Sequence, residues 1–142
     1  MRELPSCSAG ELSRLLDSLF EGAFLVDGRR TILSWNPAAE RITGYPGADV
    51  VGRSCSDGLL SHVDDAGESL CGDRCPLLRA LKTGEAQSER VYLHHSSGHR
   101  VPVVVRVLPL ETPGGRMALQ VFREDMALHT MRERLRDLEQ LS

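Results

Sequence analysis

The sequence predicts an α+β domain in which short helices cover an antiparallel sheet. Two observations indicate this class. Strand-like runs follow one another with turn residues between them, which is typical of antiparallel hairpins. Short segments with helix-start and helix-stop residues lie among these runs. The chain has 142 residues, of which 41% are hydrophobic and 26% charged, so it suits one globular domain with its own core.

Five strands are expected, because five apolar or β-branched runs are bounded by turn residues. They cover residues 23–26, 31–35, 88–94, 101–110 and 117–123. The Asp27-Gly28 pair between the first two runs is a hairpin signal, since glycine accepts a positive φ. Turn residues at 96–98 and 112–115 connect the last three strands. The strands therefore form two groups, separated by a helical and turn-rich middle.

Five helical segments are expected among and around these strands. They cover residues 11–20, 37–42, 49–51, 76–82 and 125–141. The first carries four leucines at helical spacing and is amphipathic. The second and fourth begin with proline directly after Asn36 and Cys75, and glycines at 44 and 84 lie just past their ends. Asn36 is the expected N-cap of the second helix.

The last helix carries apolar residues at the a and d positions of a heptad. They are Leu128, Met131, Leu135 and Leu138. This pattern predicts a parallel two-helix coiled coil that joins two copies of the chain. A helix folded back on its own sheet is the alternative. The expected organisation is an N-terminal helical cap at 1–21, a core at 22–124 and the start of a coiled-coil helix at 125–142.

Charge and hydropathy exclude several classes of function. The net charge of −3 argues against binding to nucleic acid, which requires a basic surface. No apolar run approaches the roughly 20 residues that span a bilayer, and no contact with a membrane is expected. The N-terminus has no continuous apolar core of a signal peptide. These features predict a cytoplasmic location, where cysteines stay reduced unless they serve metal or redox chemistry.

Residues 55–75 contain the residues with the most evident chemical potential. Cys55, His62, Cys71 and Cys75 are three of the four cysteines and one histidine within a short, turn-rich stretch. Three thiolates and an imidazole suit a tetrahedral zinc site or an iron–sulfur cluster. Asp64 and Asp65 could orient the histidine ring. The other alternative is that all four are buried structural residues.

A redox role is the third interpretation of the cysteines. Cys75 is expected at the N-terminus of a helix and next to Arg74, an environment that favours the thiolate. Cys71 would then act as its resolving partner. Haem is a further alternative, with His94 or His95 as an axial ligand. No nucleophile, base and orienting group can be recognised together, so the chain is not expected to be an enzyme.

Several segments resemble PAS sensor domains. The stretch ILSWNPAAERITGYPGADVVGR is similar to their N-A-A-E, G-Y and E-V-G pattern, and HHSSGHRVPVVVRVLPL with MALQVFRED resembles their second half. The resemblance covers residues 15–125 and implies a five-stranded antiparallel sheet with short helices on one face, an N-terminal amphipathic helix and a C-terminal signalling helix. It also implies a ligand cavity between sheet and helices, with Trp35, Asn36 and Leu77 as candidate lining residues. Of the usual Asp-Ile-Thr exit triplet only Asp125 is kept.

The cysteine segment resembles a subgroup of PAS domains with the pattern Cys…His-Val-Asp…Gly…Leu-Cys…Cys-Pro-Leu. That subgroup is found ahead of GGDEF-type diguanylate cyclase domains, but no Gly-Gly-Asp-Glu-Phe sequence occurs here. The resemblance therefore implies a non-catalytic sensory domain, covalently linked to an output domain and sensing a small molecule, a metal or redox state. The alternatives are a dimerisation domain without a ligand, or the input domain of a histidine kinase or transcription regulator.

Overall fold

A computed structural model of the chain describes residues 9–55, 60–72 and 74–141. Ten elements follow one another along it. They are α1 (Ala9–Asp17), β1 (Gly22–Val26), β2 (Ile32–Trp35), α2 (Pro37–Thr43), α3 (Gly47–Val50), α4 (Pro76–Thr83), β3 (Gln87–His94), β4 (Arg100–Thr112), β5 (Gly115–Glu124) and α5 (Met126–Leu141). The five strands and most helices lie where the sequence predicts them.

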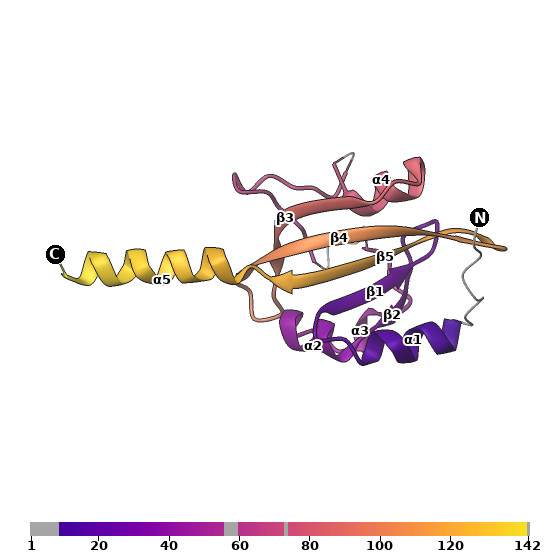
Figure 1. Cartoon of the computed structure of the whole chain (residues 1–142), viewed down its shortest axis with the longest axis horizontal. Helices are drawn as coiled ribbons and strands as arrows, with labels where there is room; N and C mark the ends of the chain where they lie inside the picture. Colours follow the sequence, from indigo (N-terminus) through magenta and orange to yellow (C-terminus); the bar gives the residue numbers. More distant parts are fainter. Residues whose placement is uncertain (1–8, 56–59, 73, 142) are drawn as a thin grey trace.

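The strands form one antiparallel sheet in the order β2-β1-β5-β4-β3. β5 lies at its centre, so that Gln120 pairs with Phe24 of β1 and with Val107 of β4. This arrangement confirms the expected α+β class and the five-stranded antiparallel sheet (Figure 1). Because β5 is the central strand and is followed directly by α5, a change in the sheet has a short path to that helix.

The main core lies between the inner face of the sheet and the helices α2, α3 and α4. Alternation along the strands sends every second side chain to this face. The buried residues that meet there include Phe24, Val26, Ala39, Ile42, Val50, Leu77, Ala80, Val91, Leu93, Val103, Val105, Val107 and Phe122. Burial of this many apolar side chains is the main source of stability for a domain of this size.

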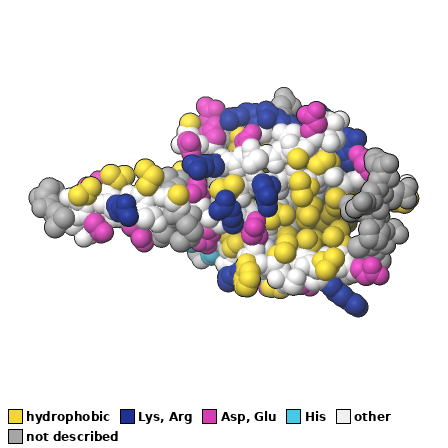
Figure 2. Space-filling model, in the orientation of Figure 1, with side chains coloured by type: hydrophobic (Ala, Val, Ile, Leu, Met, Phe, Trp, Pro, Cys, Tyr) yellow, Lys and Arg dark blue, Asp and Glu magenta, His cyan; other side chains and the backbone are white. Residues whose placement is uncertain are grey.

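The helix α1 covers part of the opposite, outer face. Its Leu16 packs with Leu25, Leu119 and Val121 in a second, smaller cluster. Hydrophobic side chains also gather on the sheet face that Figure 2 shows, and Leu108 is 44% exposed. The outer face is therefore only partly covered within one copy of the chain.

Two local details differ from the sequence predictions. α1 ends at Asp17 and not at Phe20, because the amides of Ser18 and Leu19 bond to carbonyls three residues back and tighten the last turn. Gly22 belongs to β1 and does not terminate the helix. A Cβ at this position would overlap the ring of Phe122, so close packing across the sheet requires the glycine.

The turn between β1 and β2 also differs from its prediction. The left-handed conformation falls on Arg30, with φ of 65°, and not on Gly28. The carboxylate of Asp27 holds the turn, since it accepts hydrogen bonds from the backbone amides of Arg29 and Thr31, both at 2.9 Å. Side-chain capping by the aspartate, more than the flexibility of the glycine, therefore shapes this hairpin.

The helix α5 extends away from the sheet, as Figure 1 shows. It does not fold back on the domain, which was the alternative. Met131, Leu135 and Leu138 on its expected seam are 60%, 58% and 63% exposed. Leu128 belongs to the same helix, but its side chain lies outside the described residues. No helix in the described part of the chain is long and apolar enough to cross a membrane.

Candidate functional site: a buried polar cavity and the cysteine segment

The segment of residues 60–72 is fixed against the free edge of β3. Val63 exchanges two backbone hydrogen bonds with Tyr92, at 3.0 and 2.9 Å, and so extends the sheet by one bridge. Leu60 and Leu70, each 1% exposed, anchor the segment in the core. The backbone amide of Leu70 donates to the carbonyl of His62 at 2.9 Å. These contacts position His62 beneath the sheet.

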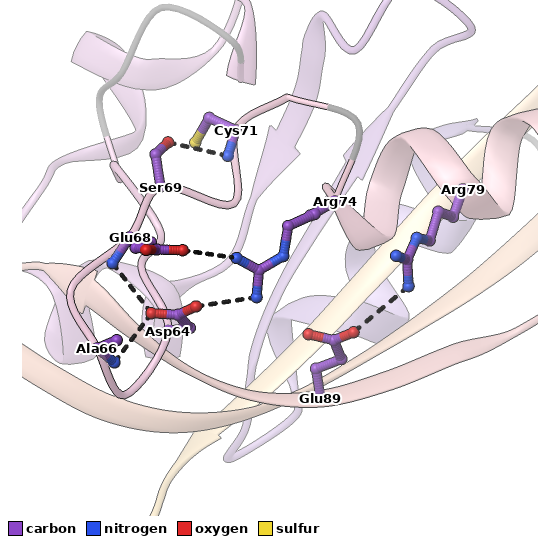
Figure 3. A network of polar contacts seen from close by, with 8 residues as sticks. All are labelled: Asp64, Ala66, Glu68, Ser69, Cys71, Arg74, Arg79 and Glu89. Carbon is purple, nitrogen blue, oxygen red and sulfur yellow. Dashed lines mark hydrogen bonds and ion pairs between the residues drawn. The ribbon is translucent and has the colours of Figure 1, made fainter.

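Three charged residues of this segment, Asp64, Glu68 and Arg74, interact with one another (Figure 3). One carboxylate oxygen of Asp64 accepts from the amides of Ala66 and Glu68 at 2.9 and 3.0 Å. The other lies 2.9 Å from the guanidinium of Arg74, which is also 3.6 Å from Glu68. The hydrogen bond from the Glu68 amide, followed by that from Arg74, lowers the pKa of Asp64.

This geometry changes two expectations about neighbouring groups. The guanidinium of Arg74 is paired with the carboxylates of Asp64 and Glu68, and the redox role of Cys75 stays a prediction. The Asp64 carboxylate likewise accepts hydrogen bonds from the turn amides of Ala66 and Glu68 and from Arg74, and not from the ring of His62. Asp64, Glu68 and Arg74 form a partly exposed ion-pair network.

The three cysteines that the structure describes are thiols in different surroundings. Cys55 and Cys75 are buried in the main core, with 7% and 5% of their surfaces exposed. Cys71 is half-buried, and its backbone amide donates to the hydroxyl of Ser69 at 3.1 Å. The four predicted ligands are thus not all gathered around one point within the described part of the chain.

A zinc or iron–sulfur site needs three or four ligands around one point. Among residues 9–55, 60–72 and 74–141, no three His, Cys, Asp or Glu side chains gather in this way. The arrangement described here therefore does not supply the ligand set of such a site. The metal hypothesis stays a prediction, and the metal content of anaerobically purified protein tests it directly.

His62 and Cys75 do line one small cavity under the sheet. Its other walls are Pro76, Val91, Val105 and Gln120. The space open to the centre of a water molecule is about 10 Å³. Within the described part of the chain, neither Nε2 of His62 nor Nε2 of Gln120 has a hydrogen-bond partner, although both atoms are buried. The cavity wall therefore contains a cysteine and two polar atoms that have no hydrogen-bond partner among the described residues.

His62 is held neutral in this position. Burial is the larger cause, and the nearby cation of Arg100 the smaller one, of a pKa lowered from 6.5 to about 4. Arg100 itself is fixed by a hydrogen bond of 2.5 Å to the carbonyl of Ser61. A neutral imidazole presents one N–H donor and one bare nitrogen acceptor. The ring is thus able to bind a hydrogen-bonding molecule at neutral pH.

Gln120 did not emerge from the sequence as a candidate. It is 2% exposed and lies on β5 between Ala118 and Phe122, two apolar residues of the same inner face. The signal was present in the alternation MALQVF, where one amide occupies a position that the strand period assigns to the core. A polar residue at a core position indicates a specific role more strongly than a polar residue at the surface does.

The three predicted pocket residues have structural contacts. Trp35 lies in an aromatic cluster, 5.2 Å from the ring of Phe24, and its indole donates to the carbonyl of Tyr45 at 2.9 Å. Leu77 is 1% exposed and packs in the main core. Neither residue is among those that line the cavity beside His62.

Asn36 satisfies all of its hydrogen-bonding capacity within the protein. Its side-chain oxygen accepts from the amides of Ala39 and Ala23, both at 2.9 Å. Its side-chain nitrogen donates to the carbonyls of Leu16 and Glu21, at 2.8 and 3.0 Å. The first contact confirms Asn36 as the N-cap of α2. The others join α2, β1 and the end of α1, so that the side chain acts as a structural connector.

The two histidines considered for haem lie at the end of β3. Nδ1 of His94 is 3.0 Å from the hydroxyl of Tyr45. The ring of His95 stacks on His99 at 4.4 Å, and its Nδ1 accepts from the amide of Ser97 at 3.0 Å. Burial, followed by the proximity of His99, lowers the pKa of His95. Both rings have protein partners, and haem binding stays an untested alternative.

Asp125 connects the sheet to α5. It is 4% exposed, its amide donates to the carbonyl of Pro102 in β4 at 2.9 Å, and its carboxylate lies 3.5 Å from Arg90 in β3. The residue directly follows β5 and precedes α5. The junction is therefore attached to three neighbouring strands.

The sheet order, the helices on its inner face and the helix that follows its last strand define the class of PAS-like α+β domains. A family model described as "PAS fold" matches residues 10–126. The chain therefore belongs to the PAS family. PAS domains are in general non-catalytic sensory domains of signal transduction, and they commonly dimerise and connect to output domains.

Solved structures of PAS domains share this fold. The PAS domain of nitrogen regulation protein NR(II) from Vibrio parahaemolyticus has a TM-score of 0.62 and 22% identity, with 83% of this chain and 99% of that chain covered. A PAS domain from a two-component sensor histidine kinase has a TM-score of 0.62 and 19% identity, with coverage of 80% and 93%.

A longer similarity is found with an RNA-binding light-oxygen-voltage receptor. Its TM-score is 0.68 and its identity 22%, with 99% of this chain but 41% of that chain covered. At these identities the similarity concerns the fold alone. None of the curated proteins matches the sequence.

Proposed function

We propose that the chain is a sensory input domain that detects its signal beneath the sheet and transmits it through α5 to an output domain. The observation that carries this proposal is the junction at Asp125. A buried residue, bonded to β4 and paired with β3, directly connects the central strand to an exposed helix that carries an apolar seam. A shift among these strands would change the direction in which α5 leaves the sheet.

The signal is received by a dimer, which two copies of the chain form through their α5 helices. Its support is the seam of Met131, Leu135 and Leu138, each more than half exposed in one copy. A parallel coiled coil would bury these side chains at its a and d positions. Two states of the sheet would then correspond to two arrangements of the helices, which is the requirement for coupling between distant sites.

Sedimentation equilibrium tests the dimer. Leu135→Glu replaces a seam residue that is already 58% exposed, so the fold of one copy should be retained. Burial of one leucine contributes about 1.5–3 kcal/mol, and two are lost per dimer. The dissociation constant should therefore rise at least about hundredfold.

Thr130→Glu is the matched control for this experiment. It introduces the same side chain on α5 at an exposed position outside the heptad seam. It should leave the dimer almost unchanged. A chain that remains monomeric at millimolar concentration, or equal effects of the two substitutions, would contradict a dimer through this seam.

The output domain is proposed to be a diguanylate cyclase. The support is the pattern of Cys55, His62, Cys71 and Cys75, which resembles that of PAS domains ahead of such enzymes. Conversion of GTP to cyclic di-GMP by the natural full-length protein is the test. Phosphotransfer or promoter binding in place of that activity would favour a histidine kinase or a transcription regulator. The first of these is also the kind of protein named for one structural neighbour.

A further inference from the structure

Two charged residues of α5 flank the apolar seam on its two sides. Arg134 directly precedes Leu135, an a residue of the heptad, and therefore takes the g position. Glu139 directly follows Leu138, a d residue, and takes the e position. Both charged side chains are exposed on one copy of the chain. A cation and an anion thus border the same surface that exposes the seam.

A parallel, in-register pair of α5 helices would bring these opposite charges together. In that arrangement a g residue of one helix faces the e residue of the next heptad on the other helix. Arg134 of one copy would face Glu139 of the other, and the twofold symmetry of the dimer would repeat the ion pair. The apolar seam supplies affinity, while the charges beside it decide which helix is accepted and in which direction.

The same residues disfavour an antiparallel pair. If two α5 helices ran in opposite directions and overlapped along the whole seam, Leu135 of one copy would face Met131 of the other. Arg134 would then lie opposite Arg134 of the other copy, because g residues border g residues in this arrangement. Like charges placed across an interface are destabilising. The charge pattern therefore favours one direction of the helices and opposes the other.

We propose that Arg134 and Glu139 form reciprocal ion pairs between two copies of the chain and so select the parallel, in-register dimer of α5. This inference rests on the proposed dimer and names the residues that set its direction and register. A slip by one heptad would separate the two charges and leave half of the seam uncovered. Both sheets would lie at one end of the coiled coil, and output domains that follow the two helices would meet at the other.

Sedimentation equilibrium of charge-reversed chains tests these ion pairs. Arg134→Glu turns both attractive pairs of the parallel dimer into pairs of like charge, and Glu139→Arg does the same with the opposite sign. For two exposed ion pairs, the dissociation constant of either single variant should rise at least about fivefold. In 1 M salt, where the Debye length is about 3 Å, this difference should largely disappear.

The chain that carries both reversals has opposite charges at the two positions again. Its dissociation constant should return to within about twofold of the unmodified value, because the two substitutions are coupled. Arg136→Glu is the matched control, since it makes the same exchange of side chains on α5 at the b position, away from the seam. This control should also stay within about twofold of the unmodified chain.

Three results would overturn the proposal. An Arg134→Glu chain that dimerises as tightly as the unmodified chain would indicate antiparallel helices, in which one repulsive pair merely replaces another. Equal weakening by Arg136→Glu, or a double variant as weak as the single ones, would show that the two residues do not pair. Leu135→Glu reports on the dimer itself. If it breaks the dimer while the charge reversals have no effect, the ion pairs fail and the proposed function stands.

Discussion

The buried imidazole of His62 makes a specific prediction about stability and pH. Its pKa in the folded protein is about 4, below the ordinary value of 6.5. Below pH 6.5 the unfolded chain therefore binds a proton that the folded protein does not. The stability associated with neutral His62 is fully present above pH 6.5 and is lost as the pH falls towards 4. No further loss from this residue is expected below that value.

The size of the effect follows from the two pKa values. Between pH 7.5 and pH 5, the free energy of unfolding should decrease by about 2 kcal/mol through His62 alone. With a urea m-value of about 1–3 kcal/mol/M, the unfolding midpoint should fall by roughly 1 M. Because the side chain is almost fully buried, little of this effect is screened by solvent.

Urea unfolding of the unmodified chain and of His62→Gln at both pH values measures this contribution. Other groups titrate in both proteins, so the difference between their pH dependences isolates His62. Between pH 7.5 and pH 5, the free energy of unfolding of the variant should fall by about 2 kcal/mol less than that of the unmodified chain. Equal losses in the two proteins would show that His62 is accessible to protons in the folded state, and would refute the description of a closed cavity.

Two further predictions concern the connections that position the site. Asn36→Asp keeps the N-cap acceptor but loses the amide hydrogens that donate to the carbonyls of Leu16 and Glu21. In urea titrations the free energy of unfolding should therefore fall by about 2–4 kcal/mol. A decrease below about 0.5 kcal/mol would show that these bonds do not stabilise the domain. Gly22→Ala should lower the free energy of unfolding by about 1–3 kcal/mol, because the added Cβ overlaps the ring of Phe122. In the double variant with Phe122→Leu, the loss of stability should be smaller than the sum of the losses in the two single variants. Strict additivity of the pair would contradict the packing explanation.

Local sequence signals predicted much of the fold, because the residues that form the elements also bound them. Asn36 with Pro37 marks the start of α2, and Gly84, with φ of 73°, marks the end of α4. The alternation of β3 places Val91 and Leu93 on one face, and both are buried in the core. These features depend on neighbours within a few residues, which is the range that periodicity and capping rules cover.

The site was less predictable because it depends on contacts between distant segments. Arg74 is next to Cys75 in sequence, yet its guanidinium pairs with Asp64, ten residues away. Gln120 joins His62 at one cavity only because β5 is the central strand of the sheet. Spacing along the chain indicated which segment carries the chemistry, but the direction of each side chain is a property of the tertiary fold.

The central claim is that the state of the cavity is coupled to α5. The most direct test is the dimer dissociation constant, measured by sedimentation for the unmodified chain and for His62→Gln, which changes one wall of the cavity. A coupling free energy in the usual range predicts that the constant changes by at least about fivefold. Identical constants for the unmodified chain and for His62→Gln would contradict the account.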